Sequence, residues 1–247
     1  MSNNGNLKKM KRYAISDIHG NYKALKEVLK KSKFDYENDE LIVLGDICDG
    51  YGDSYYVVEE LLKVKNLVFV IGNHDKWWME HMANGWAEHI WLAQGGMATL
   101  NSYKCDSYSY KKIPQSHKDF YNKGVYYYEI DGMLFVHGGF HYPKHPSKND
   151  IEVLVWDRTL YNRCQRGLQI NGWRKVFIGH TSTEPEGAKP VIIEPRIKEG
   201  ATLVNIDCGA GWKGRLCLYN IDTDKYILSK FAKGHDLYKK RKENFKE

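Results

Sequence analysis

Residues 12–20 read Arg12-Tyr13-Ala14-Ile15-Ser16-Asp17-Ile18-His19-Gly20, a short apolar run that ends in a polar motif. The same arrangement recurs four more times, always with the motif directly after a run that suits a buried strand. The other motifs are Gly45-Asp46, Gly72-Asn73-His74-Asp75, His137-Gly138-Gly139 and Gly179-His180. Residues just past such strands collect at one edge of a sheet, where α/β proteins place their active sites. We therefore expect the five motifs to lie together.

The intervals between motifs fit an α/β fold. Asp17 and Asp46 are 29 residues apart, and Asp46 and Asn73 are 27 apart, as a strand–helix–strand unit requires. Helical spacing predicts helices over 22–33 and 54–65, the second capped by Ser54. An Asp-Gly pair at 131–132 predicts a tight hairpin. Strands are predicted at 12–15, 41–44, 67–71, 126–130, 133–136, 175–178, 191–194, 202–206, 216–219 and 225–229.

The chain of 247 residues is expected to form one domain over residues 12–232. Residues 76–124 are aromatic and polar without a clear strand, and are expected to form a helical insertion over the active edge. Basic segments flank the domain at 1–11 and 233–247, including Lys8 and Lys9 and the run 239–242. They are interpreted either as solvated tails or as a source of weak attraction to nucleic acid or phosphoprotein.

Composition places few further limits. Hydrophobic residues make up 42% and charged residues 28%, which is ordinary for a globular protein. No apolar run approaches the roughly 20 residues that span a bilayer, and residues 1–10 lack a secretory signal. Five scattered cysteines without a Cys-x-x-Cys pair argue against a disulfide framework. We expect a cytoplasmic protein without a membrane partner.

Apart from Asp75, the motif residues offer two Asp, one Asn and four His, a ligand set for two divalent transition metals. Asp17 and His19 flank Ile18, so in an extended segment they point the same way and chelate one ion. Asp46 bridges both ions. The second ion takes Asn73, His137 and His180. Such a pair lowers the pKa of a bridging water, producing a hydroxide that attacks phosphorus.

His74 follows Asn73 directly, so its side chain diverges from the ligand direction. We predict that it acts as a general acid toward the leaving oxygen. Asp49 is expected to accept its other ring proton and hold the imidazolium upright. The remaining histidines have no comparable context and are expected at the surface: His81, His89, His117, His141, His145 and His235.

These motifs resemble the calcineurin-type metallophosphoesterases, whose signature is D-x-H, G-D, G-N-H-[ED], a strand ending in H, and G-H. Within that superfamily the chain resembles the phosphoprotein phosphatases, especially small bacterial, phage and diadenosine-tetraphosphatase members. Residues 91–96 are similar to W-x-x-N-G-G, residues 155–158 to L-W-x-R, and residues 206–210 to I-D-T-G-A. The resemblance covers about residues 12–222 and implies a four-layer fold, a β-sandwich flanked by helices.

The resemblance implies the same metal and acid roles. It adds Arg158 as a clamp on the substrate phosphate, beside Asn73. It implies manganese as the metal, with iron or zinc as alternatives. One departure concerns G-D-x-V-D-R-G, which reads Gly45-Asp46-Ile47-Cys48-Asp49-Gly50-Tyr51 here, so that an arginine is missing at Gly50.

Three functions stay open at this point. The first is hydrolysis of phosphomonoesters, as in a serine/threonine protein phosphatase. The second is hydrolysis of nucleotides, dinucleoside polyphosphates or nucleic-acid ends, which aromatic residues of the insertion favour because they can stack on bases. A non-enzymatic metal-binding scaffold is the third, and it would not need His74 and Asp49.

Overall fold

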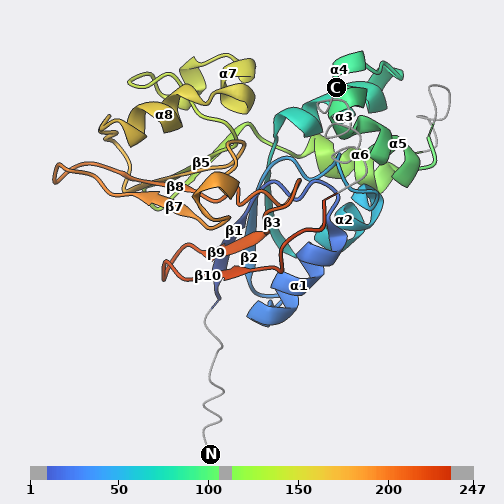
Figure 1. Ribbon diagram of the computed structural model, residues 1–247, viewed down its shortest axis with the longest axis horizontal. Coiled ribbons are helices and arrows are strands. Elements are labelled where there is room, and N and C mark those ends of the chain that lie inside the picture. The colour runs from blue at the N-terminus through green and yellow to red at the C-terminus, as the bar shows by residue number, and fades with distance from the viewer. Residues whose placement is uncertain (1–9, 106–112, 235–247) are drawn as a thin grey trace, which may run out of the picture.

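The computed structural model describes residues 10–105 and 113–234. Two five-stranded sheets pack against each other, with helices on their outer sides (Figure 1). The first sheet has the order β10-β9-β1-β2-β3 and the second has the order β4-β5-β6-β8-β7. The strands are β1 (Arg12–Ile15), β2 (Glu40–Leu44), β3 (Asn66–Val70), β4 (Tyr127–Ile130), β5 (Met133–Val136), β6 (Lys175–Ile178), β7 (Val191–Ile193), β8 (Thr202–Asn205), β9 (Cys217–Asn220) and β10 (Tyr226–Leu228).

Each sheet has a parallel centre. Strands β1, β2 and β3 run parallel, as do β5, β6 and β8, whereas β4, β7, β9 and β10 pair antiparallel with their neighbours. The carboxyl ends of the parallel strands therefore carry the loops with the polar motifs. The expected hairpin joins β4 to β5, and Asp131 and Gly132 both have positive φ, of 49° and 69°.

Three hydrophobic cores separate the layers. The first fills the outer side of the first sheet, where the helices α1 (Tyr22–Ser32), α2 (Ser54–Leu61) and α3 (Asn73–Asn84) bury their apolar faces. The second lies between the sheets and contains Ala14, Ile42, Phe135, Phe177 and Val204. The third fills the outer side of the second sheet, beneath the helices α7 (Ile151–Trp156) and α8 (Thr159–Gln165). The expected four layers, a β-sandwich flanked by helices, are therefore confirmed.

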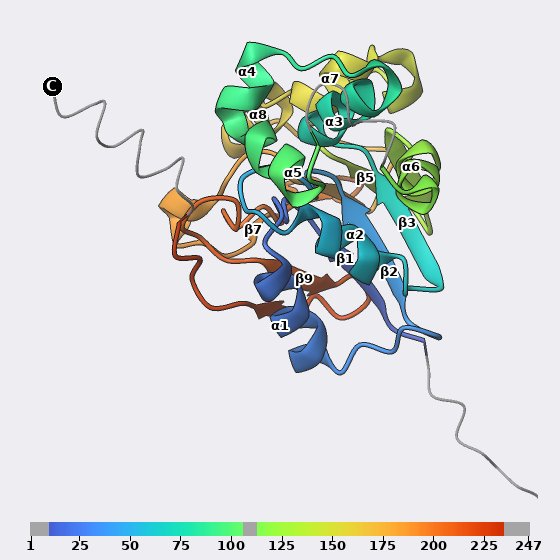
Figure 2. The same ribbon diagram turned by 90° about the vertical axis from the view of Figure 1, so that its right-hand side faces the viewer.

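Helices gather in three places, as the two views together show (Figures 1 and 2). Helices α1 and α2 cover the first sheet, and α7 and α8 cover the second. The helices between residues 73 and 122 cluster beyond the end of the first sheet. The helices are α1 (Tyr22–Ser32), α2 (Ser54–Leu61), α3 (Asn73–Asn84), α4 (His89–Trp91), η1 (Leu92–Gly96), α5 (Met97–Ser102), α6 (Gln115–Asn122), η3 (Pro146–Lys148), α7 (Ile151–Trp156), α8 (Thr159–Gln165) and η4 (Glu184–Glu186). Within the described ranges, none of the helices is long and apolar enough to cross a membrane.

Two local predictions were wrong. Ser54 does not cap α2, because it is the first helical residue and its Oγ lies 3.2 Å from Oγ1 of Thr99. His81 and His117 are not surface residues, since both are fully buried among the helices that follow β3. The ring of His81 stacks on Trp78, and the Nε2 of His117 lies 2.8 Å from Oε1 of Glu59. His235 and the basic runs at Lys8–Lys9 and 239–242 lie outside the described residues.

Candidate active site

The loop after β1 places Asp17 and His19 beside each other. Their φ angles are 52° and 48°, so the segment is not extended as predicted, and both residues occupy the left-handed region. Side chains there carry a conformational cost that usually marks a functional site. The Nε2 of His19 still lies 3.9 Å from Oδ1 of Asp17. The two side chains therefore converge, although by a different backbone path.

Asp46 lies between histidines from the two sheets. Its Oδ2 is 3.7 Å from Nε2 of His19 and 3.3 Å from Nε2 of His137. Its Oδ1 accepts a hydrogen bond of 2.9 Å from the backbone N–H of His74. The backbone approaches so closely here that a Cβ on Gly72 would lie 2.2 Å from Asp46 Oδ1. The carboxylate is thus held at the junction of the two sheets.

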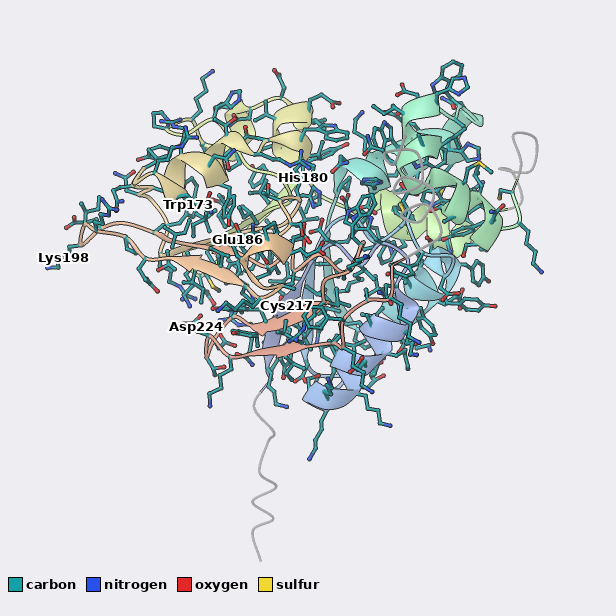
Figure 3. The ribbon with its side chains drawn as sticks, viewed as in Figure 1. Trp173, His180, Glu186, Lys198, Cys217 and Asp224 are labelled. Carbon is teal, nitrogen blue, oxygen red and sulfur yellow. The ribbon has the colours of Figure 1, made fainter. Side chains whose placement is uncertain are left out.

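The second sheet contributes His137 and His180. The Nδ1 of the fully buried His137 donates to the carbonyl of Leu44 at 2.6 Å, which leaves its Nε2 facing Asn73 Oδ1 at 3.1 Å. The backbone N–H of His180 donates to Asp17 Oδ2 at 3.1 Å. In Figure 3, His180 appears between the helices above the second sheet and those beyond the first. Its Nε2 is buried and has no hydrogen-bond partner among the described residues.

The pair of His74 and Asp49 stands next to these residues. The Nδ1 of His74 lies 2.7 Å from Asp49 Oδ2. Burial lowers the pKa of His74, but the charges of Asp46 and Asp49 outweigh it and raise that pKa to about 9. Two further donors hold Asp49: Trp91 Nε1 at 2.8 Å and Thr99 Oγ1 at 2.6 Å. Neither role was foreseen, although Trp91 belongs to a stretch that resembles a family motif.

A pocket is lined by Arg158 together with most of the residues described above: Asp17, His19, Asp46, Asn73, His74 and His180. Arg158 is exposed, and its guanidinium donates to the carbonyl of His180 at 3.3 Å. Gly50, where the family pattern has arginine, also lines the pocket and has a φ of 84°. The buried side chain of Asp207 lines it too, and was assigned no role from the sequence. The sequence could have indicated a role for Asp207, because it is the aspartate of residues 206–210, the stretch that resembles I-D-T-G-A. The cavity has a volume of about 190 Å³.

The donor set fits divalent metal ions. Two groups of side chains each bring their ligand atoms within 4.8 Å: His19, Asp46 and His74, and Asp46, His137 and His180. Burial raises the pKa of Asp17 to about 6, and burial together with the charge of Asp17 raises the pKa of Asp207. Buried carboxylates in this state need positive charge nearby. Oxygen and imidazole donors together suit manganese, iron or zinc.

His74, for which the sequence predicts the role of general acid, belongs to one of these groups. Its Nδ1 is occupied by Asp49, and its backbone N–H is bonded to Asp46. A carboxylate oxygen of Asp17, Oδ1, lies 3.9 Å from Nε2 of His19, on the same loop.

Comparisons with known proteins agree with this geometry. A family profile described as calcineurin-like phosphoesterase matches residues 10–197. The chain belongs to the calcineurin-like phosphoesterase family. It is therefore a metallophosphoesterase, a hydrolase that uses divalent metal ions.

Two relatives are described as symmetrical bis(5'-nucleosyl)-tetraphosphatases. One, from Buchnera aphidicola subsp. Schizaphis graminum, is 32% identical over 92% of this chain and 100% of its own length. Another, from Buchnera aphidicola subsp. Acyrthosiphon pisum, is 43% identical over 72% of this chain and 46% of its own length.

Solved structures share the fold. A candidate diadenosine tetraphosphatase has a TM-score of 0.63 at 18% identity, covering 92% of this chain and 95% of its own. A serine/threonine phosphatase from Saccharomyces cerevisiae has a TM-score of 0.54 at 15% identity, covering 93% of this chain and 82% of its own. At these identities the similarity concerns the fold alone.

Proposed function

We propose that this enzyme hydrolyses bis(5'-nucleosyl) tetraphosphates or closely related nucleoside polyphosphates. The observation that carries the proposal is the 32% identity with a symmetrical bis(5'-nucleosyl)-tetraphosphatase along that relative's whole length. From the motif resemblance alone, a serine/threonine protein phosphatase is the first candidate function and a nucleotide or dinucleoside polyphosphate hydrolase is the alternative. The names of the relatives favour the alternative.

The charge of the pocket supports the same choice. Arg158 is the one guanidinium among its lining residues in the described ranges, because Gly50 has no side chain. A phosphomonoester carries a charge of about −1.5 to −2 at neutral pH. A phosphoryl group inside a polyphosphate chain has given up one of its ionisable oxygens to the next phosphate. A single guanidinium therefore matches the internal phosphoryl group better than the monoester.

Six residues would hold the metal ions. Asp17 and His19 would bind one ion, Asn73, His137 and His180 the other, and Asp46 would be shared. When bound, the ions would supply the positive charge that activates water and stabilises the phosphoryl oxygens.

The chain's own residues orient the substrate and move the proton. Arg158 extends into the pocket, where its planar donors can take two phosphoryl oxygens. Asp49 accepts from Nδ1 of His74, which fixes Nε2 as the free nitrogen on the pocket side. His74 would then donate the Nε2 proton to the leaving oxygen. Asn73, at the start of α3, would bind the substrate phosphate as well as the metal.

The substrate is tested by comparing three compounds with the manganese-loaded enzyme. We expect kcat/KM for diadenosine tetraphosphate to exceed that for a phosphoserine peptide by at least about 100-fold, equivalent to about 2.7 kcal/mol in transition-state stabilisation. An aryl phosphate reports the general phosphoesterase activity. A phosphopeptide that is hydrolysed faster than diadenosine tetraphosphate would overturn the proposal.

The shared ligand is tested separately by metal analysis. Asp46→Asn should lose bound metal, because one carboxylate faces histidines of both groups. Asp53→Asn is the matched control, since Asp53 is exposed and makes no side-chain cap bond. Two ions retained per chain in Asp46→Asn, with activity intact, would rule out the bridging role.

A further inference from the structure

Two tryptophans that line the pocket belong to none of the three hydrophobic cores. Trp78 and Trp91 lie in the first core, and Trp77 and Trp173 pack against the first and third cores. By contrast, Trp156 and Trp212 are half-buried at the pocket. Indoles bury large apolar areas, so a tryptophan outside the core needs another reason for its position.

Trp212 is held beside His19 by a braced loop. The carbonyl of Gly209 accepts from the backbone N–H groups of Trp212, at 3.0 Å, and Gly214, at 2.8 Å. The hydroxyl of Tyr51 donates to the carbonyl of Trp212 at 2.9 Å. The neighbouring Gly211 packs so tightly that a Cβ there would lie 2.4 Å from Cδ2 of His19. The backbone of Trp212 is therefore held in place by these contacts.

Trp156 is held beside His180 at the end of α7. Its ring centroid lies 5.6 Å from that of His180 in an edge contact, and 5.0 Å from that of Trp77. Trp77 in turn contacts the ring of His74, with centroids 5.2 Å apart. One pocket indole therefore contacts His180, and the other is carried by the residue that follows Gly211, which packs against His19.

The size of the pocket leaves most of a nucleotide outside it. Its volume of about 190 Å³ is below the roughly 300–1,000 Å³ of pockets that enclose drug-sized ligands. It is therefore suited to a phosphoryl group, while the nucleoside parts lie across the rim. Aromatic side chains stack on bases with about 1–3 kcal/mol per base. A substrate with a nucleobase at each end thus finds a stacking surface on both indoles.

We propose that Trp156 and Trp212 form a nucleobase-binding rim, one stacking the base on each side of the scissile phosphate. The proposal rests on the proposed nucleotide substrate. It adds the residues that distinguish a nucleoside phosphate from a bare phosphate.

The test uses competitive inhibition of aryl phosphate hydrolysis, which does not require diadenosine tetraphosphate to be a substrate. Adenosine diphosphate and inorganic pyrophosphate are compared as inhibitors of the manganese-loaded enzyme. In the double variant Trp156→Leu/Trp212→Leu, which removes both faces on which the single base of adenosine diphosphate can stack, the inhibition constant of adenosine diphosphate should rise by about 5- to 150-fold. That of pyrophosphate should stay within twofold. Trp212→Phe and Trp156→Phe, which keep an aromatic face and most of the packing, should recover much of the affinity.

Trp86→Leu is the matched control, because this indole is 64% exposed and does not line the pocket. It should leave both constants unchanged. If the leucine double variant loses affinity equally for adenosine diphosphate and pyrophosphate, the tryptophans have a merely structural role. If both inhibition constants are unchanged, the tryptophans have no role in binding. Either result would contradict the proposed nucleobase-binding rim. If the wild type does not cleave diadenosine tetraphosphate, the proposed substrate fails, while the inhibition constants still decide the rim.

Discussion

The two sheets hold their parts of the site by different means. In the first sheet, buried carboxylates bind backbone N–H groups. Asp75 accepts from Asp46 at 2.6 Å, Gly72 at 2.9 Å and Ile47 at 3.0 Å, so it ties the loop after β2 to the start of α3. In the second sheet the His180 imidazole rests on ring contacts with His137 and Trp156, and Arg158 is exposed with one hydrogen bond of 3.3 Å.

This difference separates a rigid part from an adjustable part. Charge-assisted hydrogen bonds to the backbone are short and strong, so the first sheet holds His74 and Asp46 in fixed positions. An exposed guanidinium keeps its freedom until a phosphate orders it. We therefore expect changes near the first sheet to affect chemistry and stability, and changes at Arg158 to affect substrate capture.

The largest effect is expected for His74→Asn. General acid catalysis contributes about 10²–10⁴ in rate, so kcat should fall by that factor while the metals stay bound. The loss should be smaller for 4-nitrophenyl phosphate than for phenyl phosphate, whose leaving group needs the proton more. His141→Asn, at an exposed histidine, should match the wild type. An equal loss on both substrates would contradict proton donation.

The next effect concerns the rigid part itself. Asp75→Asn would place an amide N–H₂ or a weaker acceptor against three backbone donors. We expect the free energy of unfolding to fall by about 3 kcal/mol, as when a buried charged acceptor is lost, measured by urea denaturation. Metal affinity should weaken as well, because Asp46 loses its anchor. Asp53→Asn serves again as the control. If the variant keeps its stability and its metal, the rigid-part interpretation is wrong.

A smaller effect is expected in the adjustable part. Arg158→Ala should lower kcat/KM by a factor that corresponds to a loss of about 2–3 kcal/mol in transition-state stabilisation. Arg158→Lys should recover only part of this loss, because an ammonium cannot reproduce the planar guanidinium fork. Arg163→Ala, at an exposed arginine of α8, should have no effect. Activity of Arg158→Ala within twofold of the wild type would exclude the clamp.

The sequence also suggests that Gly50→Arg would restore a second clamp, and the structure argues against this. Gly50 has a φ of 84°, which an arginine adopts only with strain. A Cβ on Gly95 would lie 2.5 Å from the nitrogen of Gly50, which shows how closely the two loops pack.

The smallest effect lies away from the site, on the outer side of the first sheet. The buried carboxylate of Glu60 accepts from Lys26, Lys63 and Tyr36. Burial raises its pKa, but these hydrogen bonds outweigh burial and lower the pKa to about 2. A depressed carboxyl pKa stabilises the fold above the unfolded value of 4.5, and this stability is lost as pH falls toward 2.

Glu60→Gln should therefore lower the free energy of unfolding by about 1–2 kcal/mol at pH 7, a value reduced because the lysines are half exposed. The difference from the wild type should disappear near pH 2. Glu37→Gln removes an exposed pair with Lys65 and should change little. A difference that persists unchanged at low pH would show that charge is not the cause.

The sequence predicts most of the first sheet and its site because strand ends and metal-ligand motifs coincide there. Each of Asp17, Asp46 and Asn73 follows its strand within three residues, so local pattern suffices to bring them together. The supports of Asp49 could not be predicted in this way. Trp91 and Thr99 lie 42 and 50 residues further along the chain, among helices whose packing no periodicity specified.

Two other differences have the same origin. The buried His81 and His117 depend on tertiary contacts within those helices, which the polar composition of the segment concealed. The left-handed backbone at Asp17 and His19 follows from hydrogen bonds to the loop after β2, such as His19 N–H to Asp46 O at 2.8 Å, and not from local propensity.

The contacts of Trp91 and Thr99 with Asp49 have a consequence for how this enzyme can be altered. The orientation of His74, the proposed proton donor, depends through Asp49 on an indole and a hydroxyl supplied by a segment far along the chain. A chimaera that exchanges these helices for those of another phosphoesterase would also exchange the supports of its acid. Such a graft must carry both side chains with it, or the His74 imidazole loses the alignment that the host loops alone do not provide.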